Sequence, residues 1–208
     1  MDPQNDTPEK PSGPAVEPPG GGAVDGIRRV SRPVALPLDR LLIRANVWRL
    51  RWIHLREGIG GIEAELRRMR ADHARVLRTF GAAVAEDASI VGPVSLTNSA
   101  RDFSNLVIGS LTHVGSEAFF DLAGPITIEE GATISMRAVI ITHLDVGRGP
   151  LAARRPRRVA PVRICEGAFV GAGAVILDGV TVGREAVVGA GVVVDSDIPD
   201  GAVVRRPG

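Results

Sequence analysis

An aliphatic residue recurs at every sixth position across residues 164–199. In blocks of six, this segment reads ICEGAF, VGAGAV, ILDGVT, VGREAV, VGAGVV and VDSDIP. The residues that open the blocks are Ile164, Val170, Ile176, Val182, Val188 and Val194. The second position holds Gly171, Gly183 and Gly189, and the fifth holds Ala168, Ala174, Val180, Ala186 and Val192. A period of six matches neither a helix nor a simple strand, but it fits a chain that turns a corner after each short strand.

The same step extends, less regularly, toward the amino terminus. Its positions are Ile90, Leu96, Ile108, Val114, Phe120, Ile126, Ile134 and Ile140, with an irregular block at Asp102 and a two-residue slip from Ile126 to Ile128. A long excursion over residues 144–163 then interrupts it. Three six-residue strands make one triangular coil of about 18 residues, with the aliphatic side chains inside and the small ones at the corners. The sequence therefore predicts a mainly β solenoid of roughly six coils over residues 88–208.

The composition supports this fold and narrows the function. Hydrophobic residues make up 44% of the 208 residues, but aromatic residues make up only 3%, which suits a narrow interior of Val, Ile, Leu and Ala. The net charge of +1 gives no electrostatic reason to expect a nucleic-acid partner. Cys165 is the only cysteine, so no intramolecular disulfide can form, and we expect a reducing, cytoplasmic location.

Two further segments precede the repeats. Residues 1–37 are rich in Pro and Gly, which predicts a disordered tail, and their polar start is not that of a signal peptide. Residues 38–82 form a predicted helical segment, with one helix up to Gly58 and a second from Ile62 to about Phe80. The apolar positions of the second helix are Leu66, Met69, His73, Val76 and Leu77.

The helical segment has two interpretations. It caps the end of the solenoid, or its first helix, which carries Trp48, Trp52 and several arginines, lies on an anionic membrane surface. Charged residues at positions 40, 44, 49 and 51 exclude a membrane-spanning helix.

The blocks VGAGAV, VGREAV and VGAGVV resemble the hexapeptide repeats of left-handed β-helix acyltransferases. The resemblance covers residues 88–207 and implies a left-handed parallel β-helix that assembles as a homotrimer. The segment AVIITHLDVGRGPL, followed by PVRICEGAFVGAGAVI, is similar to the catalytic region of the maltose and galactoside O-acetyltransferases. This similarity implies transfer of acetyl from acetyl-CoA to a hydroxyl of a sugar or a sugar-containing metabolite.

His143 is the candidate catalytic residue because it lies where the regular pattern ends, at the root of the excursion. A neutral imidazole can take a proton from an alcohol, and the resemblance assigns His143 as the general base for direct attack on the thioester. His54, His73 and His113 are interpreted as structural. The alternative for His143 is a loop residue that only bonds a neighbouring carbonyl.

Further site residues follow from the resemblance, one position at a time. An acceptor-binding Asn of the family aligns with Glu117, and Asp145 is a second polar candidate for the acceptor. Asp121 is a further polar candidate near this coil, and both it and Asp145 are interpreted as corner or loop residues rather than catalytic ones. The residues aligned with CoA-binding positions are Phe169, for the aromatic beside the pantetheine arm, Ala172, Ala190, and Arg205 and Arg206 in place of a missing lysine.

Several alternatives remain open from the sequence. The arginines of the excursion form a solvated basic loop, or they attract an anionic acceptor or the CoA phosphates. A zinc site of three histidines is not expected, because the repeats offer only His113 and His143. The enzyme reading competes with N-acetylation of an amino sugar or xenobiotic, and with a non-catalytic β-helix scaffold.

Overall fold

The computed structural model describes residues 37–205, with side chains from residue 46 onward. The tail predicted over residues 1–37 lies outside this range except for Pro37, and Arg206 lies outside it as well. No helix within the described range is long and apolar enough to cross a membrane.

In the described part of the chain, three helices precede the strands: α1 (Pro37–Glu57), α2 (Ile59–Leu66) and α3 (His73–Thr79). The single second helix predicted from Ile62 to Phe80 is wrong, because residues 67–72 separate α2 from α3. Asp72 has a φ of 66°. A helix cannot pass through a non-glycine residue in this left-handed region, so α3 begins only after it.

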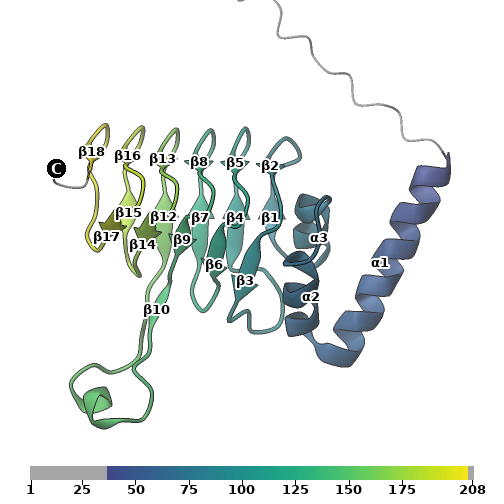
Figure 1. Ribbon diagram of the computed structural model, residues 1–208, viewed down its shortest axis with the longest axis horizontal. Helices are drawn as coiled ribbons and strands as arrows, with labels where there is room; N and C mark the ends of the chain where they lie inside the picture. The colour runs from purple at the N-terminus through teal and green to yellow at the C-terminus, as the bar shows by residue number, and fades with distance from the viewer. Residues whose placement is uncertain (1–36, 206–208) are drawn as a thin grey trace, which may run out of the picture. The chain divides into compact units, whose positions relative to one another are not determined.

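Of the 18 strands between residues 37 and 205, sixteen form three parallel sheets. The first sheet contains β1 (Ala83–Val84), β4 (Leu106–Ile108), β7 (Ile126–Ile128), β12 (Val162–Ile164) and β15 (Thr181–Val182). The second contains β2 (Ser89–Ile90), β5 (His113–Val114), β8 (Thr133–Ile134), β13 (Phe169–Val170), β16 (Val187–Val188) and β18 (Val203–Val204). The third contains β3 (Ser95–Thr97), β6 (Phe119–Asp121), β9 (Val139–Ile140), β14 (Val175–Ile176) and β17 (Val193–Val194). The chain visits the sheets in turn, so the fold is a parallel β-solenoid, as predicted (Figure 1).

The aliphatic and small positions of the six-residue pattern lie in the core of the solenoid. The six residues that open the blocks are at most 5% exposed, and the five at the fifth position are at most 6% exposed. The slip from Ile126 to Ile128 arises because both isoleucine side chains of β7 are buried, next to Leu106 and Ile108 of β4. In the irregular block, Phe103 rather than Asp102 is buried.

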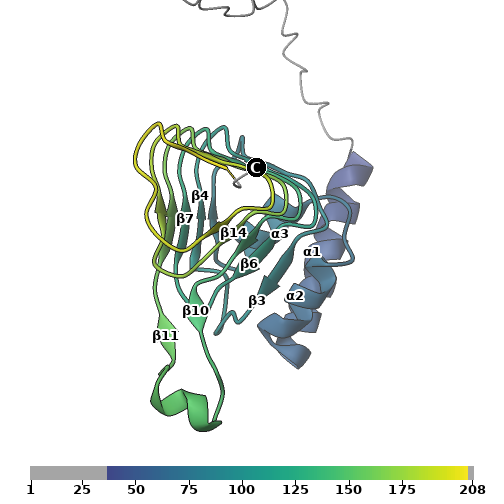
Figure 2. The same ribbon diagram turned by 60° about the vertical axis from the view of Figure 1, so that its left-hand side comes forward.

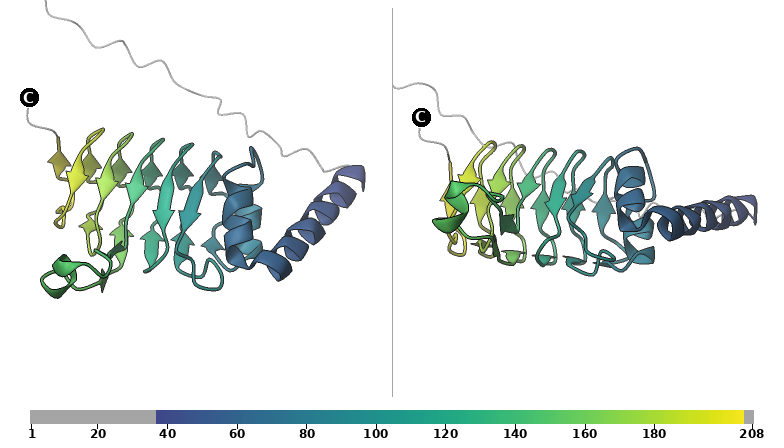
Figure 3. Two further views of the ribbon diagram at one scale, coloured as in Figure 1. Left: turned by 60° about the horizontal axis from the view of Figure 1, so that its bottom comes forward. Right: turned by 90° about the horizontal axis from the view of Figure 1, so that it is seen from below.

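The helices α2 and α3 lie against the end of the solenoid that holds β1 to β3 (Figure 3). Ile62, Leu66, Val76 and Leu77 belong to the same hydrophobic core as the strands. The ring of His73 lies over Gly92, where a Cβ atom would come within 1.8 Å of the ring. In α1, by contrast, Trp48 and Trp52 remain exposed.

The chain departs from regular winding at one corner, between the third sheet and the first. The inward residues of consecutive strands are six apart at the other corners, but here Leu96 is followed by Ile108, Phe120 by Ile128, and Ile140 by Ile164. Residues 98–105, 122–125 and 141–161 therefore form three insertions in successive coils. We call this edge of the solenoid the insertion corner.

The longest insertion is a β-hairpin that leaves the solenoid at the insertion corner (Figure 2). Strands β10 (His143–Leu144) and β11 (Arg158–Val159) pair antiparallel, and the 3-10 helix η1 (Pro150–Ala153) lies at the far end. Val159 packs on Gly124 of the preceding coil, where a Cβ atom would lie 2.8 Å from its Cγ1. The excursion predicted over residues 144–163 is thus an ordered hairpin with a packed base.

Candidate active site

His143 and Asp121 form a close pair at the insertion corner. The His143 Nδ1 atom lies 2.6 Å from Asp121 Oδ2, although the residues are 22 positions apart in the chain. Strand β6 lies beside β9, with Phe120 opposite Ile140, so Asp121 reaches the same corner one coil before His143. The side chain of Asp121 is 2% exposed and that of His143 is 25% exposed. The pair therefore joins a buried carboxylate to an imidazole that solvent can reach.

A network of donors fixes the Asp121 carboxylate. Asn98 Nδ2 donates to Oδ1 over 2.7 Å, and the Thr142 backbone N–H donates to Oδ2 over 2.8 Å. The Thr142 hydroxyl lies within hydrogen-bonding distance of both Asp121 Oδ2 and the Asp121 carbonyl oxygen. The Gly124 N–H donates to the same hydroxyl over 2.8 Å. All three insertions contribute to this network, which explains why the polar groups gather at this corner.

These contacts decide the protonation of the pair. Burial alone would raise the pKa of Asp121, but hydrogen bonds from His143, Asn98 and Thr142 outweigh it and lower the pKa below its usual value. An ionised carboxylate only accepts hydrogen bonds, so His143 Nδ1 must carry the proton that it donates to Asp121. In the neutral imidazole, Nε2 is then the basic nitrogen.

The structure gives Glu117 and Asp145 other partners. Glu117 occupies the corner before β6, with a φ of 61°, and its carboxylate binds Arg137 Nε at 2.7 Å. Glu117 thus lies before the start of β6, whereas Asp121 is the last residue of that strand. Asp145 accepts a hydrogen bond from the Gly147 N–H over 2.7 Å and lies 3.5 Å from Arg157 Nε, so it shapes the start of the hairpin.

The residues aligned with CoA-binding positions lie at a different edge, between the second and third sheets. Here a Cβ atom on Gly171 would lie 2.6 Å from Ala190 N, and one on Gly189 would lie 3.5 Å from the Arg205 Cα. Ala172 accepts a hydrogen bond from the Gly191 N–H over 2.9 Å. We call this edge the glycine corner (Gly115, Gly171 and Gly189).

The glycine corner has the features of a binding groove. Phe169, on the strand that leads to it, leaves 41% of its surface exposed. A pocket of about 360 Å³ continues along the same edge and includes Ala172, His113 and Met136. Ala172, Ala190 and Arg205 therefore lie at one edge of the solenoid in successive coils. Within one chain, sheet three separates this groove from His143.

Sequence reasoning missed the role of Asp121. The interpretation as a corner or loop residue did not include the buried carboxylate or its hydrogen bond to His143. The signal was the two-residue slip, which lengthens this coil to 20 residues and places position 121 beside position 141. Asn98 and Thr142 carried no comparable signal, because their partners depend on the insertions.

Residues 46–205 contain no group of three or more His, Cys, Asp or Glu side chains that could hold a metal ion. His113 is exposed on β5 and lies in the second sheet, away from His143. The geometry of the site thus offers acid–base chemistry through one imidazole and one carboxylate.

Comparison with known proteins agrees with the repeat fold. Residues 161–196 match the family model described as bacterial transferase hexapeptide (six repeats). A 2,3,4,5-tetrahydropyridine-2,6-dicarboxylate N-acetyltransferase of Staphylococcus aureus (strain JH9) is 43% identical over 64 residues. That match spans 30% of this chain and 27% of the relative, so the chain covers about a quarter of the length of its curated relative.

Solved structures extend the likeness across the solenoid. The hexapeptide-repeat acetyltransferase VCA0836 of Vibrio cholerae O1 biovar eltor, solved in complex with acetyl-CoA, has a TM-score of 0.59 and 23% identity over 70% of this chain and 78% of its own. A maltose O-acetyltransferase of Clostridium difficile 630 has a TM-score of 0.57 and 20% identity over 80% of this chain and 83% of its own. The resemblance to hexapeptide-repeat acetyltransferases is confirmed, and at these identities the structures establish the shared fold.

Proposed function

We propose that this protein is a CoA-dependent acetyltransferase that transfers acetyl to a hydroxyl of a sugar or a sugar-containing metabolite. The observation that carries the proposal is the His143–Asp121 pair, at 2.6 Å, at the corner where the repeats are interrupted. The family match to residues 161–196 and the acetyl-CoA complex of a structural neighbour support CoA as the acyl carrier.

In this proposal His143 acts as general base and Asp121 positions it. Nε2 takes the proton of the acceptor hydroxyl while the oxygen attacks the thioester carbonyl. The imidazolium that forms is stabilised by the Asp121 carboxylate, which keeps its charge because its pKa is lowered. When the tetrahedral intermediate collapses, Nε2 returns the proton to the departing CoA sulfur. No covalent bond to the protein is needed.

A homotrimer would complete the site. His143 lies at the insertion corner and the CoA-binding positions lie at the glycine corner, so one chain alone does not bring them together. We propose that the insertion corner of one subunit faces the glycine corner of the next, which gives three equivalent sites. Exposed apolar side chains on the second and third sheets, Phe169, Val193 and Val203, offer surface for such packing. The single cysteine supports a cytoplasmic location for this assembly.

The decisive experiment replaces the base. In His143→Ala, we expect CoA release in the presence of acceptor to fall at least ~100-fold, because general base catalysis is typically worth ~10² to 10⁴. The acetyl-CoA affinity and the oligomeric state should not change, since the glycine corner is untouched. A rate near that of the wild type in a folded His143→Ala protein would refute the assignment.

Amine acceptors are a second candidate, favoured by the N-acetyltransferase that is 43% identical over 64 residues. The same imidazole would then deprotonate an ammonium or the attacking amine. Matched alcohol and amine acceptors, assayed by thiol release, separate the two reactions. A non-catalytic scaffold makes a different prediction: calorimetry with CoA would show no saturable binding.

A further inference from the structure

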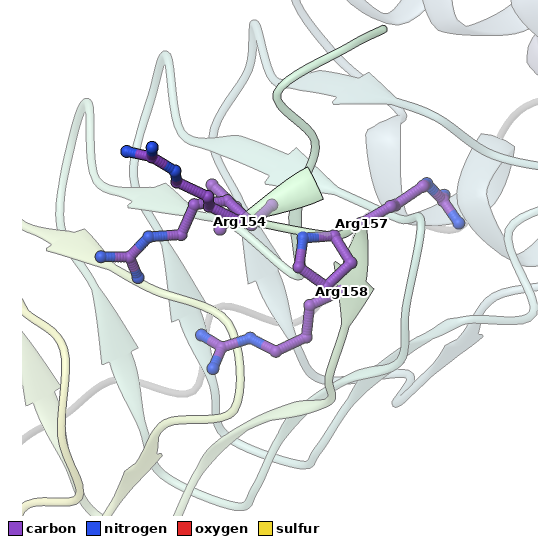
Figure 4. Close-up of a pocket in the computed structure, with 6 residues that line it drawn as sticks. Arg154, Arg157 and Arg158 are labelled. Carbon is purple, nitrogen blue, oxygen red and sulfur yellow. The ribbon is translucent and has the colours of Figure 1, made fainter. Parts of the chain in front are cut away.

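The β10–β11 hairpin carries an unbalanced positive charge. Between residues 144 and 159 there are five arginines and a single carboxylate, Asp145. The hairpin encloses a pocket of about 390 Å³ (Figure 4). Its lining residues are Leu144, Arg154, Arg155, Pro156, Arg157 and Arg158. Arg154 and Arg158 reach toward one side of the hairpin, and Arg157 reaches toward the other.

Two of these arginines are neutralised by the fold. Arg158 Nε binds Asp178 Oδ2 at 2.5 Å, which ties the base of the hairpin to the next coil. Arg157 lies 3.5 Å from Asp145. Arg154 and Arg155 are exposed and form no ion pair with any side chain of residues 46–205. Two guanidinium groups at one pocket are therefore free to bind an anion.

The pocket begins beside the proposed base. Leu144 lines it, follows His143 directly, and lies opposite Arg158 in the β-ladder. The pocket thus lies on the hairpin whose first strand begins at the proposed base. Guanidinium suits phosphate and carboxylate oxygens, because its planar donors bind two oxygens at once.

We propose that this pocket binds an anionic group of the acceptor, a phosphate monoester or a carboxylate, and so makes the enzyme selective for acidic sugars. This inference rests on the proposed function. The CoA phosphates have the same chemistry, but they lie at the far end of the pantetheine arm from the thioester. A thioester at His143 therefore places them along the groove of the glycine corner and not beside Leu144.

The test compares matched acceptors: a neutral sugar, its phosphate monoester and its uronic acid. We expect wild-type kcat/KM to be about tenfold or more higher for the anionic acceptors, because charge-assisted hydrogen bonds are the strong ones. The double variant Arg154→Ala/Arg155→Ala should lose this preference, with kcat/KM for the neutral sugar changed by less than about twofold. Arg68→Ala/Arg70→Ala removes the same charge from exposed positions at the helical end and should keep the preference.

Two further arms locate the anion. The first arm replaces acetyl-CoA by its analogue without the 3′-phosphate, and Arg154→Ala/Arg155→Ala should still lose the preference for anionic acceptors. If the double variant and the wild type behave alike with this analogue, the pocket binds CoA and the proposal is wrong. Calorimetric titration with the sugar phosphate and the parent sugar tests the pocket even if no acceptor is acetylated. Equal binding of the two sugars by the wild type, or equal losses in both double variants, overturns the proposal.

Discussion

Replacing Asp121 by Asn tests the proposed active site without removing a catalytic atom. An amide has nearly the same shape as the carboxylate, but it carries no charge and has one oxygen in place of two. The carboxylate oxygen Oδ2 accepts hydrogen bonds from the Thr142 N–H and hydroxyl as well as from His143. We therefore expect the amide oxygen of Asp121→Asn to occupy that position and keep the bond to His143 Nδ1, while the Asn98 amide turns so that its oxygen accepts from the new NH2 group.

The expected loss follows from the missing charge. Two unit charges about 4 Å apart attract by about 4 kcal/mol at an effective dielectric constant of about 20. A neutral hydrogen bond recovers about 1 kcal/mol of this. The stabilisation of the imidazolium in the transition state should thus fall by about 3 kcal/mol, which corresponds to a decrease of roughly 100-fold in kcat.

The measurement is the rate of thiol release at saturating acetyl-CoA, with the KM for acetyl-CoA as an internal control. The matched variant is Asp197→Asn, because this exposed carboxylate also accepts a backbone hydrogen bond, from Thr181 N–H at 2.7 Å, but is not a hydrogen-bond partner of His143, which binds Asp121. We expect Asp197→Asn to retain wild-type turnover. If Asp121→Asn and Asp197→Asn have equal rates, while both remain folded, Asp121 does not position the base.

Two further predictions concern the solenoid end and the CoA groove. Burial lowers the pKa of His73, although the Leu66 carbonyl and Asp72 partly oppose it, so the folded state prefers neutral imidazole. The contribution of His73 to the free energy of unfolding should be fully present above about pH 6.5 and should fall as the pH drops, by at most about 1.4 kcal/mol per pH unit. Urea unfolding at several pH values should show that this free energy declines less steeply with falling pH in His73→Gln than in the wild type. Identical declines in the two proteins would contradict the role of His73. Phe169→Ala, which removes a 41% exposed side chain, should raise the KM for acetyl-CoA several-fold and leave the melting temperature nearly unchanged; an unchanged KM would remove Phe169 from the groove.

The sequence predicted the fold well because each coil repeats the same local requirement. Every sixth residue, from Ile164 to Val194, packs in the same narrow interior. The requirement for an aliphatic side chain therefore recurs in every coil, and the sequence repeats it. The helical end had no such repetition. The break before His73 depends on the left-handed backbone conformation of Asp72. The spacing of apolar residues predicted one continuous helix, because it carries no information on this backbone conformation.

The candidate site was predictable only in part. His143 stood out because it ends a regular pattern, whereas Asp121 is one polar residue among several near the corners. Its meeting with His143 depends on a coil length of 20 residues, which the small insertion at residues 122–125 sets. The sequence also could not predict that Arg154 and Arg155 are unpaired. This follows from the structure, in which Arg157 and Arg158 are the arginines of the hairpin that pair with carboxylates.

The insertion corner also has a consequence for how this scaffold can change. Residues 98–105, 122–125 and 141–161 differ widely in length, yet the strands on either side keep their register with the neighbouring coils. The hairpin contributes no residue to the hydrophobic core, so it can be exchanged at this edge without repacking the interior, whereas Phe103 and Leu122 of the other two insertions belong to the core. A hairpin transplanted from a related solenoid between His143 and Pro161 would leave the proposed base in place, so the acceptor preference that we propose can be engineered as a separable part.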